Sequence, residues 1–128
     1  MRKHHLLGAI LLCGGLFSCS SEVIQQANYE IIPLPQEIKI STGNFVLNDR
    51  TSIVYPKGND EMQQNANLLA TYIRQMSGKK LKVIDEQITS NVITLTTGLN
   101  TDNAEAYQLK VTPDNIIIRG ASEAGTFY

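Results

Sequence analysis

The order of hydrophobic and polar positions along the chain predicts a small domain with one long helix, which short strands precede and follow in the sequence. Residues 61–77 carry apolar side chains at steps of three and four, the spacing of a single helical face. The residues of this stripe are Ala66, Leu69, Ala70, Ile73 and Met76. Asp60 is expected to cap the helix, with Gln63 in the reciprocal capping-box position, and Gly78 to end it in a left-handed conformation.

Period-two alternation and β-branched runs predict the strands. Ile38 and Ile40 alternate with polar neighbours, which indicates a short edge strand. The expected strands are residues 38–41, 45–47, 52–55, 81–84, 91–96, 107–112 and 116–119. Residues 112–115 form a tight turn with proline in its second position, so the last two strands are expected to make a hairpin. Residues 120–128 have the pattern of a second helix that begins at Ser122. Together these elements predict an α/β (α+β) fold, with a small mixed sheet of short strands backed by helices.

The beginning of the chain has the pattern of a secretory signal peptide. Arg2 and Lys3 supply a basic start, an apolar run follows over residues 6–12, and small residues come next. The run is shorter than the ~20 apolar residues that a membrane-spanning helix needs. We therefore expect residues 1–18 to direct export and then to be removed.

Leu16-Phe17-Ser18-Cys19 resembles the lipobox of bacterial lipoproteins, in which cleavage precedes a cysteine that takes up lipid. The resemblance implies that Cys19 is the site of lipid attachment and that the mature protein is anchored to a bacterial cell membrane, on its periplasmic or surface face. Residues 19–29 are polar and without period, so we expect a tether between the lipid and the domain. The alternative is an ordinary signal peptide cut nearby, with Cys19 incidental.

Cleavage before Cys19 removes most of the reactive side chains. The residues lost include Arg2, Lys3, His4, His5 and Cys13. Losing the two basic residues moves the formal net charge from −1 to −3. A weakly acidic chain does not have the excess of basic residues that binding to nucleic acid or to an anionic membrane requires. A chain without histidine or a free thiol excludes Ser-His-Asp and Cys-His catalysis, histidine or thiolate metal sites, and disulfides. We expect no metal and no cofactor.

Carboxylates remain as candidates for catalysis, and tyrosines as candidates for a sugar-binding module. Asp60-Glu61 opens the expected helix, where acidic groups complement the helix dipole. Asp85-Glu86 begins a polar loop, whereas a general acid needs a pKa raised by burial or a nearby charge. We expect neither pair to be catalytic, and no catalytic residue in this chain. Without tryptophan, tyrosines would have to grip sugar rings, but isolated tyrosines are more often core or interface residues. The tyrosines are Tyr29, Tyr55, Tyr72, Tyr107 and Tyr128.

Three stretches, taken in order, carry a resemblance to a known family. They are Ile31-Ile32-Pro33-Leu34-Pro35-Gln36, then Ala106-Tyr107-Gln108-Leu109 with the hairpin after it, then Ile118-Arg119-Gly120-Ala121 through Gly125-Thr126-Phe127-Tyr128. Each stretch alone is weak evidence. In this order they resemble the N-terminal domain of bacterial β-N-acetylhexosaminidases of glycoside hydrolase family 20. The resemblance covers residues 30–128 and implies a zincin-like, non-catalytic accessory domain that precedes a (β/α)₈ barrel.

The resemblance also implies a mechanism that is located in that barrel. There an adjacent Asp-Glu pair works with the substrate: the Asp orients the 2-acetamido group, whose carbonyl oxygen attacks the anomeric carbon, and the Glu protonates the leaving oxygen. We therefore expect an accessory domain of a secreted, lipid-anchored enzyme that removes terminal N-acetylhexosamines from glycans. The glycan would bind only to a downstream barrel outside residues 1–128. Similar domains precede O-GlcNAcase-like and α-glucuronidase-like barrels. The alternative is a free-standing, non-enzymatic lipoprotein whose α/β domain binds glycan or protein.

Overall fold

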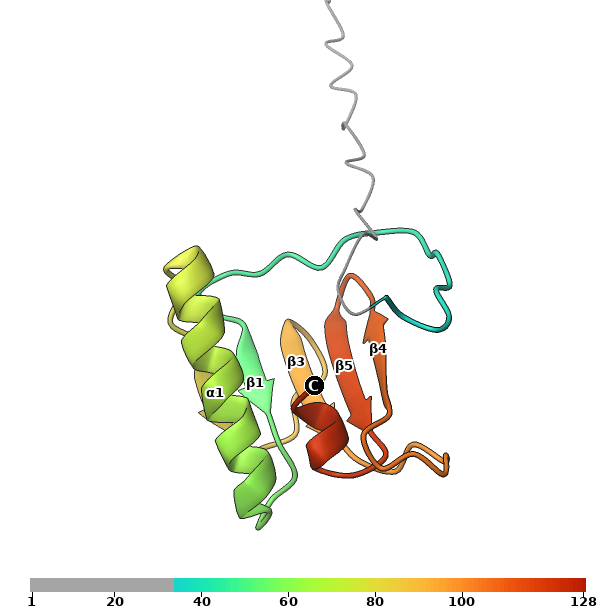
Figure 1. The fold of residues 1–128 in the computed structure, drawn as a ribbon. Coiled ribbons are helices and arrows are strands. Elements are labelled where there is room, and N and C mark those ends of the chain that lie inside the picture. The colour runs from blue at the N-terminus through green and yellow to red at the C-terminus, as the bar shows by residue number, and fades with distance from the viewer. Residues whose placement is uncertain (1–33) are drawn as a thin grey trace, which may run out of the picture. The chain divides into compact units, whose positions relative to one another are not determined.

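The computed structural model describes residues 34–128 and divides the chain into two units, residues 1–38 and 39–128. In the first unit only residues 34–38 are described, and they contain neither helix nor strand. The second unit is a five-stranded mixed sheet with one α-helix packed against it (Figure 1). This confirms the α/β class and the mixed sheet.

The sheet has the strand order β2-β1-β3-β5-β4. Along the chain the elements are β1 (Ser52–Val54), α1 (Asp60–Ser77), β2 (Lys82–Ile84), β3 (Val92–Thr96), β4 (Tyr107–Val111), β5 (Asn115–Gly120) and the 3₁₀ turn η1 (Ala124–Thr126). β1 pairs in parallel with β2 and β3, and β3 pairs in parallel with β5. β4 and β5 form the predicted antiparallel hairpin, closed by a 2.8 Å hydrogen bond from the Thr112 N–H to the Asn115 carbonyl.

Two predicted strands, residues 38–41 and 45–47, are wrong. Neither segment is a strand of the sheet, and β1, the strand that follows them, has β2 and β3 as its two neighbours, so it offers no free edge to a preceding hairpin partner. Ile40 is 73% exposed. Phe45 and Leu47 are half-buried and pack against the core without any strand pairing. The alternation of Phe45 and Leu47 with exposed neighbours therefore reflects side chains that pack against the core, and not a backbone that is hydrogen-bonded to another strand.

Helix α1 begins one residue earlier than its pattern predicts, and its cap differs. Asn59 has extended dihedrals, and its side-chain oxygen accepts a 3.0 Å hydrogen bond from the Met62 N–H. Asp60 is already helical, so the predicted capping box of Asp60 with Gln63 does not form. Gly78 ends the helix as predicted, with φ 73° and its N–H bonded to the Arg74 carbonyl at 2.9 Å.

The core lies where α1 crosses the sheet. Its buried members are Ile53, Met62, Ala66, Leu81, Ile93 and Leu95. Met62 was missing from the predicted stripe, and Met76, which the stripe included, is 89% exposed. The reason is length: an 18-residue helix is about 27 Å long, whereas the three-residue strands β1 and β2 each extend about 10 Å. The last turn of α1 therefore extends beyond the strands it covers.

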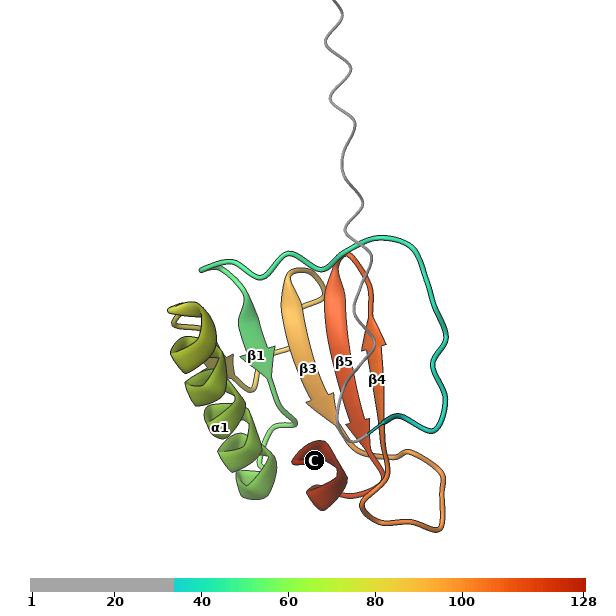
Figure 2. The ribbon, with the colours of Figure 1, turned by 45° about the horizontal axis from the view of Figure 1, so that its top comes forward.

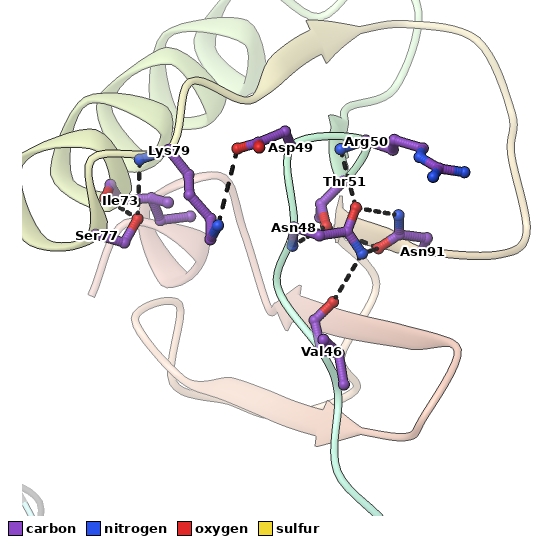
Figure 3. A network of polar contacts seen from close by, with 9 residues as sticks. All are labelled: Val46, Asn48, Asp49, Arg50, Thr51, Ile73, Ser77, Lys79 and Asn91. Atoms are coloured by element: carbon purple, nitrogen blue, oxygen red, sulfur yellow. Dashed lines mark hydrogen bonds and ion pairs between the residues drawn. The ribbon is translucent and has the colours of Figure 1, made fainter.

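A polar network holds the starts of the parallel strands together (Figure 3). Its centre is Asn91, which has φ 53° and precedes β3. The Asn91 side chain accepts a 2.7 Å hydrogen bond from the Thr51 hydroxyl and donates one of 3.0 Å to the Asn48 side chain. Its backbone N–H bonds to the Asp114 carbonyl at 2.7 Å, and its carbonyl accepts from the Ser52 N–H. One residue thus links the segments that lead into β1, β3 and β5.

At the same side of the sheet, an exposed ion pair connects the end of α1 to the turn before β1 (Figure 3). The Lys79 ammonium lies 3.8 Å from the Asp49 carboxylate, whose side chain is 83% exposed. Pairs this open to solvent contribute at most about 1 kcal/mol. The neutral Asn91 network is therefore the stronger connection.

At the other end of the sheet, the C-terminal turn is bonded to α1. The Asn59 side chain donates to the Glu123 carboxylate at 2.9 Å. The Asn65 side chain donates to the Glu123 carbonyl and to the Thr126 hydroxyl, both at 3.0 Å. The Thr126 hydroxyl also lies 3.2 Å from the Met62 sulfur. These contacts fix the position of η1 beside the first half of α1.

The predicted second helix is present only as η1, and Ser122 does not cap it. The Ser122 hydroxyl donates instead to the Ala104 carbonyl at 2.8 Å, which ties the turn to the loop before β4. Gly125 lets the same loop approach closely, since a Cβ at that position would lie 2.5 Å from the Ala106 carbonyl oxygen. The predicted local cap at Ser122 is therefore replaced by contacts of Ser122 and Gly125 with the loop before β4.

Replacing Asn91 with alanine should lower the free energy of unfolding by about 2–3 kcal/mol. The variant loses the side-chain hydrogen bonds of Asn91 with Thr51 and Asn48 and leaves a β-carbon in a left-handed conformation. Asn91→Gly keeps the backbone conformation accessible and should recover roughly 1 kcal/mol relative to alanine. Urea unfolding of the three proteins measures both differences. A glycine variant that is less stable than the alanine variant would show that backbone strain has no part in the effect.

Glu123 should make stability fall on acidification. The Asn59 side chain, and then a backbone N–H, hold the pKa of Glu123 below its usual 4.5. A carboxyl whose pKa is lower in the folded state stabilises the fold above the unfolded pKa and loses that contribution as pH falls through the folded value. Urea midpoints measured from pH 7 to acid should therefore drop more for the native chain than for Glu123→Gln. Glu105→Gln, at an exposed position before β4, is the control and should follow the native chain.

Candidate functional site

A hollow of about 270 Å³ lies in the second unit, between α1 and the β4–β5 hairpin. Two of its walls are apolar side chains from these elements. They are Leu68, Leu69 and Tyr72 of α1, and Tyr107, Leu109 and Ile118 of the hairpin. The C-terminal residues Phe127 and Tyr128 make a third wall, with their rings in an edge-to-face contact at 5.4 Å between centroids.

The hairpin wall follows from the alternation along β4. Leu109 is paired with Ile118 and Val111 with Ile116, and paired residues in an antiparallel ladder share a face. Ile116 and Ile118 pack against the core, so Leu109 and Val111 point to the core side of the sheet as well. They are nevertheless 54% and 47% exposed. The polar residues Gln108 and Lys110 occupy the opposite face. The apolar half of this hairpin is therefore open on the side where α1 packs.

The wall from α1 is a second stripe that the sequence interpretation missed. Leu68 and Tyr72 are four residues apart, so they lie one above the other beside the core-facing positions of the helix. The signal was present, since Leu68, Leu69 and Tyr72 widen the apolar face beyond what one row of core contacts requires. Tyr72 is 53% exposed.

Two polar side chains of the hollow, those of Asn65 and Thr126, are engaged in hydrogen bonds within the protein. Asn65 and Thr126 are the polar members of its lining other than the tyrosine hydroxyls, and they are hydrogen-bonded to each other at 3.0 Å. The Thr126 hydroxyl lies 2.7 Å from the Glu123 carbonyl. The lining contains no charged side chain. The arrangement suits burial of another apolar surface rather than proton transfer or nucleophilic attack.

The structure places the two acidic pairs apart from this hollow. Asp60 and Glu61 are exposed in the first turn of α1. Asp85 and Glu86 are exposed in the bend after β2. Among residues 34–128, no group of three or more His, Cys, Asp or Glu side chains is placed to hold a metal ion. No helix in this part of the chain is long and apolar enough to cross a membrane.

The fold brings together three tyrosines that the sequence pattern treats as isolated residues. Tyr55 packs against the core, as expected for an isolated tyrosine. Tyr72, Tyr107 and Tyr128, which are far apart in the chain, line the same hollow. Tyr29 and the predicted lipid-attachment site Cys19 lie outside the described residues, as do the predicted signal peptide and tether.

Comparison with known proteins identifies the domain. The model of glycosyl hydrolase family 20, domain 2, matches residues 28–128. A curated β-hexosaminidase of Porphyromonas gingivalis is 30% identical over 137 residues, which cover 98% of this chain and 17% of that protein. The solved structure of the GH20 β-N-acetylhexosaminidase from Streptomyces coelicolor A3(2) matches 76% of this chain and 19% of its own, with a TM-score of 0.59 and 19% identity.

The chain thus spans less than a fifth of the length of either relative. The structural match, at low identity, shows that the two folds agree, and the family match covers all of the second unit. It starts close to residue 30, where the resemblance in sequence begins. The chain therefore belongs to glycosyl hydrolase family 20, as its domain 2, the accessory domain of the hexosaminidases in that family.

Proposed function

We propose that this chain is the accessory domain of a secreted, lipid-anchored β-N-acetylhexosaminidase that removes terminal N-acetylhexosamine residues from glycans. The observation that carries the proposal is the match of domain 2 over residues 28–128. The curated relative that covers this chain almost entirely is a β-hexosaminidase more than five times as long. The chemistry belongs to a downstream (β/α)₈ barrel, and this domain supports it.

The side chains of the described residues fit a supporting role. The adjacent acidic pairs are exposed to solvent, and neither pair belongs to the lining of the hollow between α1 and the β4–β5 hairpin. The hollow between α1 and the β4–β5 hairpin is lined mostly by apolar and aromatic groups, and no charged side chain belongs to its lining. Such a surface contributes to binding by removing apolar area from water, at about 25 cal/mol per Å².

The anchor is the second part of the proposal. Residues 1–18 act as a lipoprotein signal and Cys19 takes up the lipid, with residues 19–29 as the tether. The support is the basic start, the short apolar run and the lipobox-like Leu16-Phe17-Ser18-Cys19. The lipid would hold the enzyme at a membrane where glycans are degraded.

Cys19→Ala should release the protein from the membrane. Each buried CH₂ contributes about 0.8 kcal/mol, and stable anchoring takes more than one acyl chain, which a lipoprotein cysteine supplies. The native precursor and the variant would be expressed in bacteria and fractionated, and the mature N-terminus determined by mass spectrometry. Ser20→Ala is the matched control and should remain in the membrane fraction. If native protein and Cys19→Ala are equally soluble with the same N-terminus, the lipoprotein assignment is wrong.

Residues 19–128 alone should show no turnover of a chromogenic N-acetylglucosaminide, whereas the longer protein encoded by the same gene should hydrolyse it. The reason is that the Asp-Glu pair of this family belongs to the barrel. Sequencing downstream of the Tyr128 codon should find that pair at the C-terminal end of a barrel strand, where such folds keep catalytic groups. Activity of the short chain that disappears in Asp85→Asn or Asp60→Asn would contradict the assignment. A stop codon directly after Tyr128 would favour a free-standing lipoprotein.

A further inference from the structure

The basic residues of this chain are concentrated in one part of the sequence. Between Glu61 and Asp85 there is no acidic residue, although the whole chain has a formal net charge of −1. The basic residues in this stretch lie close together, and they are Arg74, Lys79, Lys80 and Lys82. The structure places them in the last turn of α1, in the connection after it, and in β2, an edge strand of the sheet. This edge therefore has a local excess of positive charge.

A second hollow, of about 370 Å³, lies at this edge between α1 and β2. Its polar members are Asn67, Thr71, Arg74 and Lys80, and we call it the basic hollow. In Figures 1 and 2, α1 lies on the β1 side of the sheet, away from the β4–β5 hairpin. The basic hollow has no lining residue in common with the hollow between α1 and that hairpin. The two are therefore separate sites, on different faces of α1.

The helical repeat of α1 builds one wall of the basic hollow. Asn67, Thr71 and Arg74 are spaced by four and three residues, so they lie along one face of the helix. Lys80 comes from the connection between α1 and β2. The rest of the lining is apolar and belongs to the core or packs against it, namely Ala70, Leu81 and Val83. The hollow thus has an apolar base and a polar, cationic wall.

The polar side chains of the basic hollow are open to a ligand. No acidic residue belongs to the lining. Within residues 34–128, the side chains of Asn67, Arg74 and Lys80 make no hydrogen bond or ion pair. The Thr71 hydroxyl donates to the Asn67 carbonyl at 2.9 Å, which leaves its oxygen able to accept. In the hollow beside the hairpin, by contrast, Asn65 and Thr126 are bonded to each other.

Two structural roles account for part of the basic cluster. A cation at the end of a helix complements a dipole equivalent to about half a negative charge. Lysine on an edge strand prevents that strand from pairing with other chains. Lys79, which is paired with Asp49, and Lys82 on β2 fill these two roles. Arg74 and Lys80 are positive charges beyond this need, and both line the hollow.

We propose that the basic hollow binds an acidic group, a carboxylate or a sulfate, on a sugar of the glycan, so that the parent hexosaminidase acts on anionic glycans. This inference rests on the proposed function, because the catalytic domain of a longer parent has to act on the bound glycan. It also adds a contact outside the barrel, whereas the family resemblance in sequence places all glycan binding in the barrel.

The lining matches the chemistry of such a ligand. The guanidinium of Arg74 can donate two parallel hydrogen bonds to the oxygens of a carboxylate or sulfate, and Lys80 adds a second charge. The volume of about 370 Å³ is within the ~300–1,000 Å³ of small-molecule sites. It therefore accommodates a sugar unit together with its acidic group, with Asn67 and Thr71 available to the sugar hydroxyls.

A discrete ligand fits this hollow better than a membrane surface does. Recognition of anionic lipid surfaces uses clusters of roughly four to eight basic residues. Only Arg74 and Lys80 belong to the lining, and the amide and hydroxyl beside them have no role in attraction to a charged surface. The observations therefore favour the glycan.

Amide NMR spectra of this chain, titrated with a chondroitin sulfate pentasaccharide that ends in N-acetylgalactosamine, test the proposal. This probe carries both carboxylates and sulfates. N-acetylchitopentaose, a neutral oligosaccharide of the same length, is the control ligand. We expect the sulfated probe to shift the amide signals of residues 67–74 and 80–83, and the neutral one to leave them in place.

Arg74→Gln and Lys80→Gln should each raise the Kd for the pentasaccharide roughly twofold to fivefold, the range of an exposed charge pair, and together roughly tenfold. Lys110→Gln is the matched control, because it removes the same charge from β4, at the other edge of the sheet. It should leave the Kd unchanged. Amide signals outside the hollow show whether each variant is folded.

The absence of shifts at the basic hollow overturns the inference. An equal loss of affinity in Lys110→Gln does so as well, because the attraction would then come from charge in general. Binding of inorganic sulfate as tight as that of the pentasaccharide would show a plain anion site. Sedimentation with phosphatidylglycerol vesicles that requires Arg74 and Lys80, without binding of the pentasaccharide, would assign the cluster to the membrane instead.

The parent hexosaminidase separates this inference from the proposed function. In the parent, Arg74→Gln together with Lys80→Gln should raise the KM for the pentasaccharide roughly tenfold relative to the KM for a neutral chromogenic N-acetylglucosaminide, because the hollow holds the charged glycan near the barrel. A parent that hydrolyses the chromogenic substrate, with a chain that does not bind the pentasaccharide, keeps the hexosaminidase assignment and removes the anionic-glycan site. An inactive parent, with a chain that binds the pentasaccharide at the basic hollow, does the reverse.

Discussion

The parallel pairing of β1 with neighbours on both sides is the constraint on which the rest of the second unit depends. Two adjacent parallel strands cannot be joined by a tight turn and need a crossover of a dozen or more residues. α1 is that crossover between β1 and β2. It also brings Met62 and Ala66 onto Ile53, and all three side chains are fully buried. The topology and the core therefore arise from the same connection.

Hydrogen bonds from polar side chains fix the position of segments that lie outside the strands of the sheet. Asn91 joins the starts of three strands because its amide can donate and accept at once, and because asparagine tolerates a left-handed backbone better than most residues. Asn65 does the same for the C-terminal turn, with one amide group bonded to both Glu123 and Thr126. Regular elements are thus held by apolar burial and irregular ones by a few amides with fixed partners.

The distribution of surface chemistry fits a domain of family 20 that supports rather than reacts. Its acidic pairs are at exposed positions, and four of its aromatic residues line one uncharged hollow beside α1. Apolar area left open on an edge hairpin exposes the domain to association with other chains.

The sequence by itself determined the local elements and the family. The stripe from Ala66 to Ile73, the left-handed Gly78 and the Pro113 turn are set by interactions a few residues apart, so they could be predicted, and the order of motifs indicated family 20. Only the tertiary structure decided which alternating segments pair, that Ser122 bonds to Ala104 instead of capping a helix, and that Tyr72, Tyr107 and Tyr128 share one hollow. These outcomes depend on residues up to 56 positions apart, as Tyr72 and Tyr128 are, and local pattern carries no information about which distant partner lies alongside.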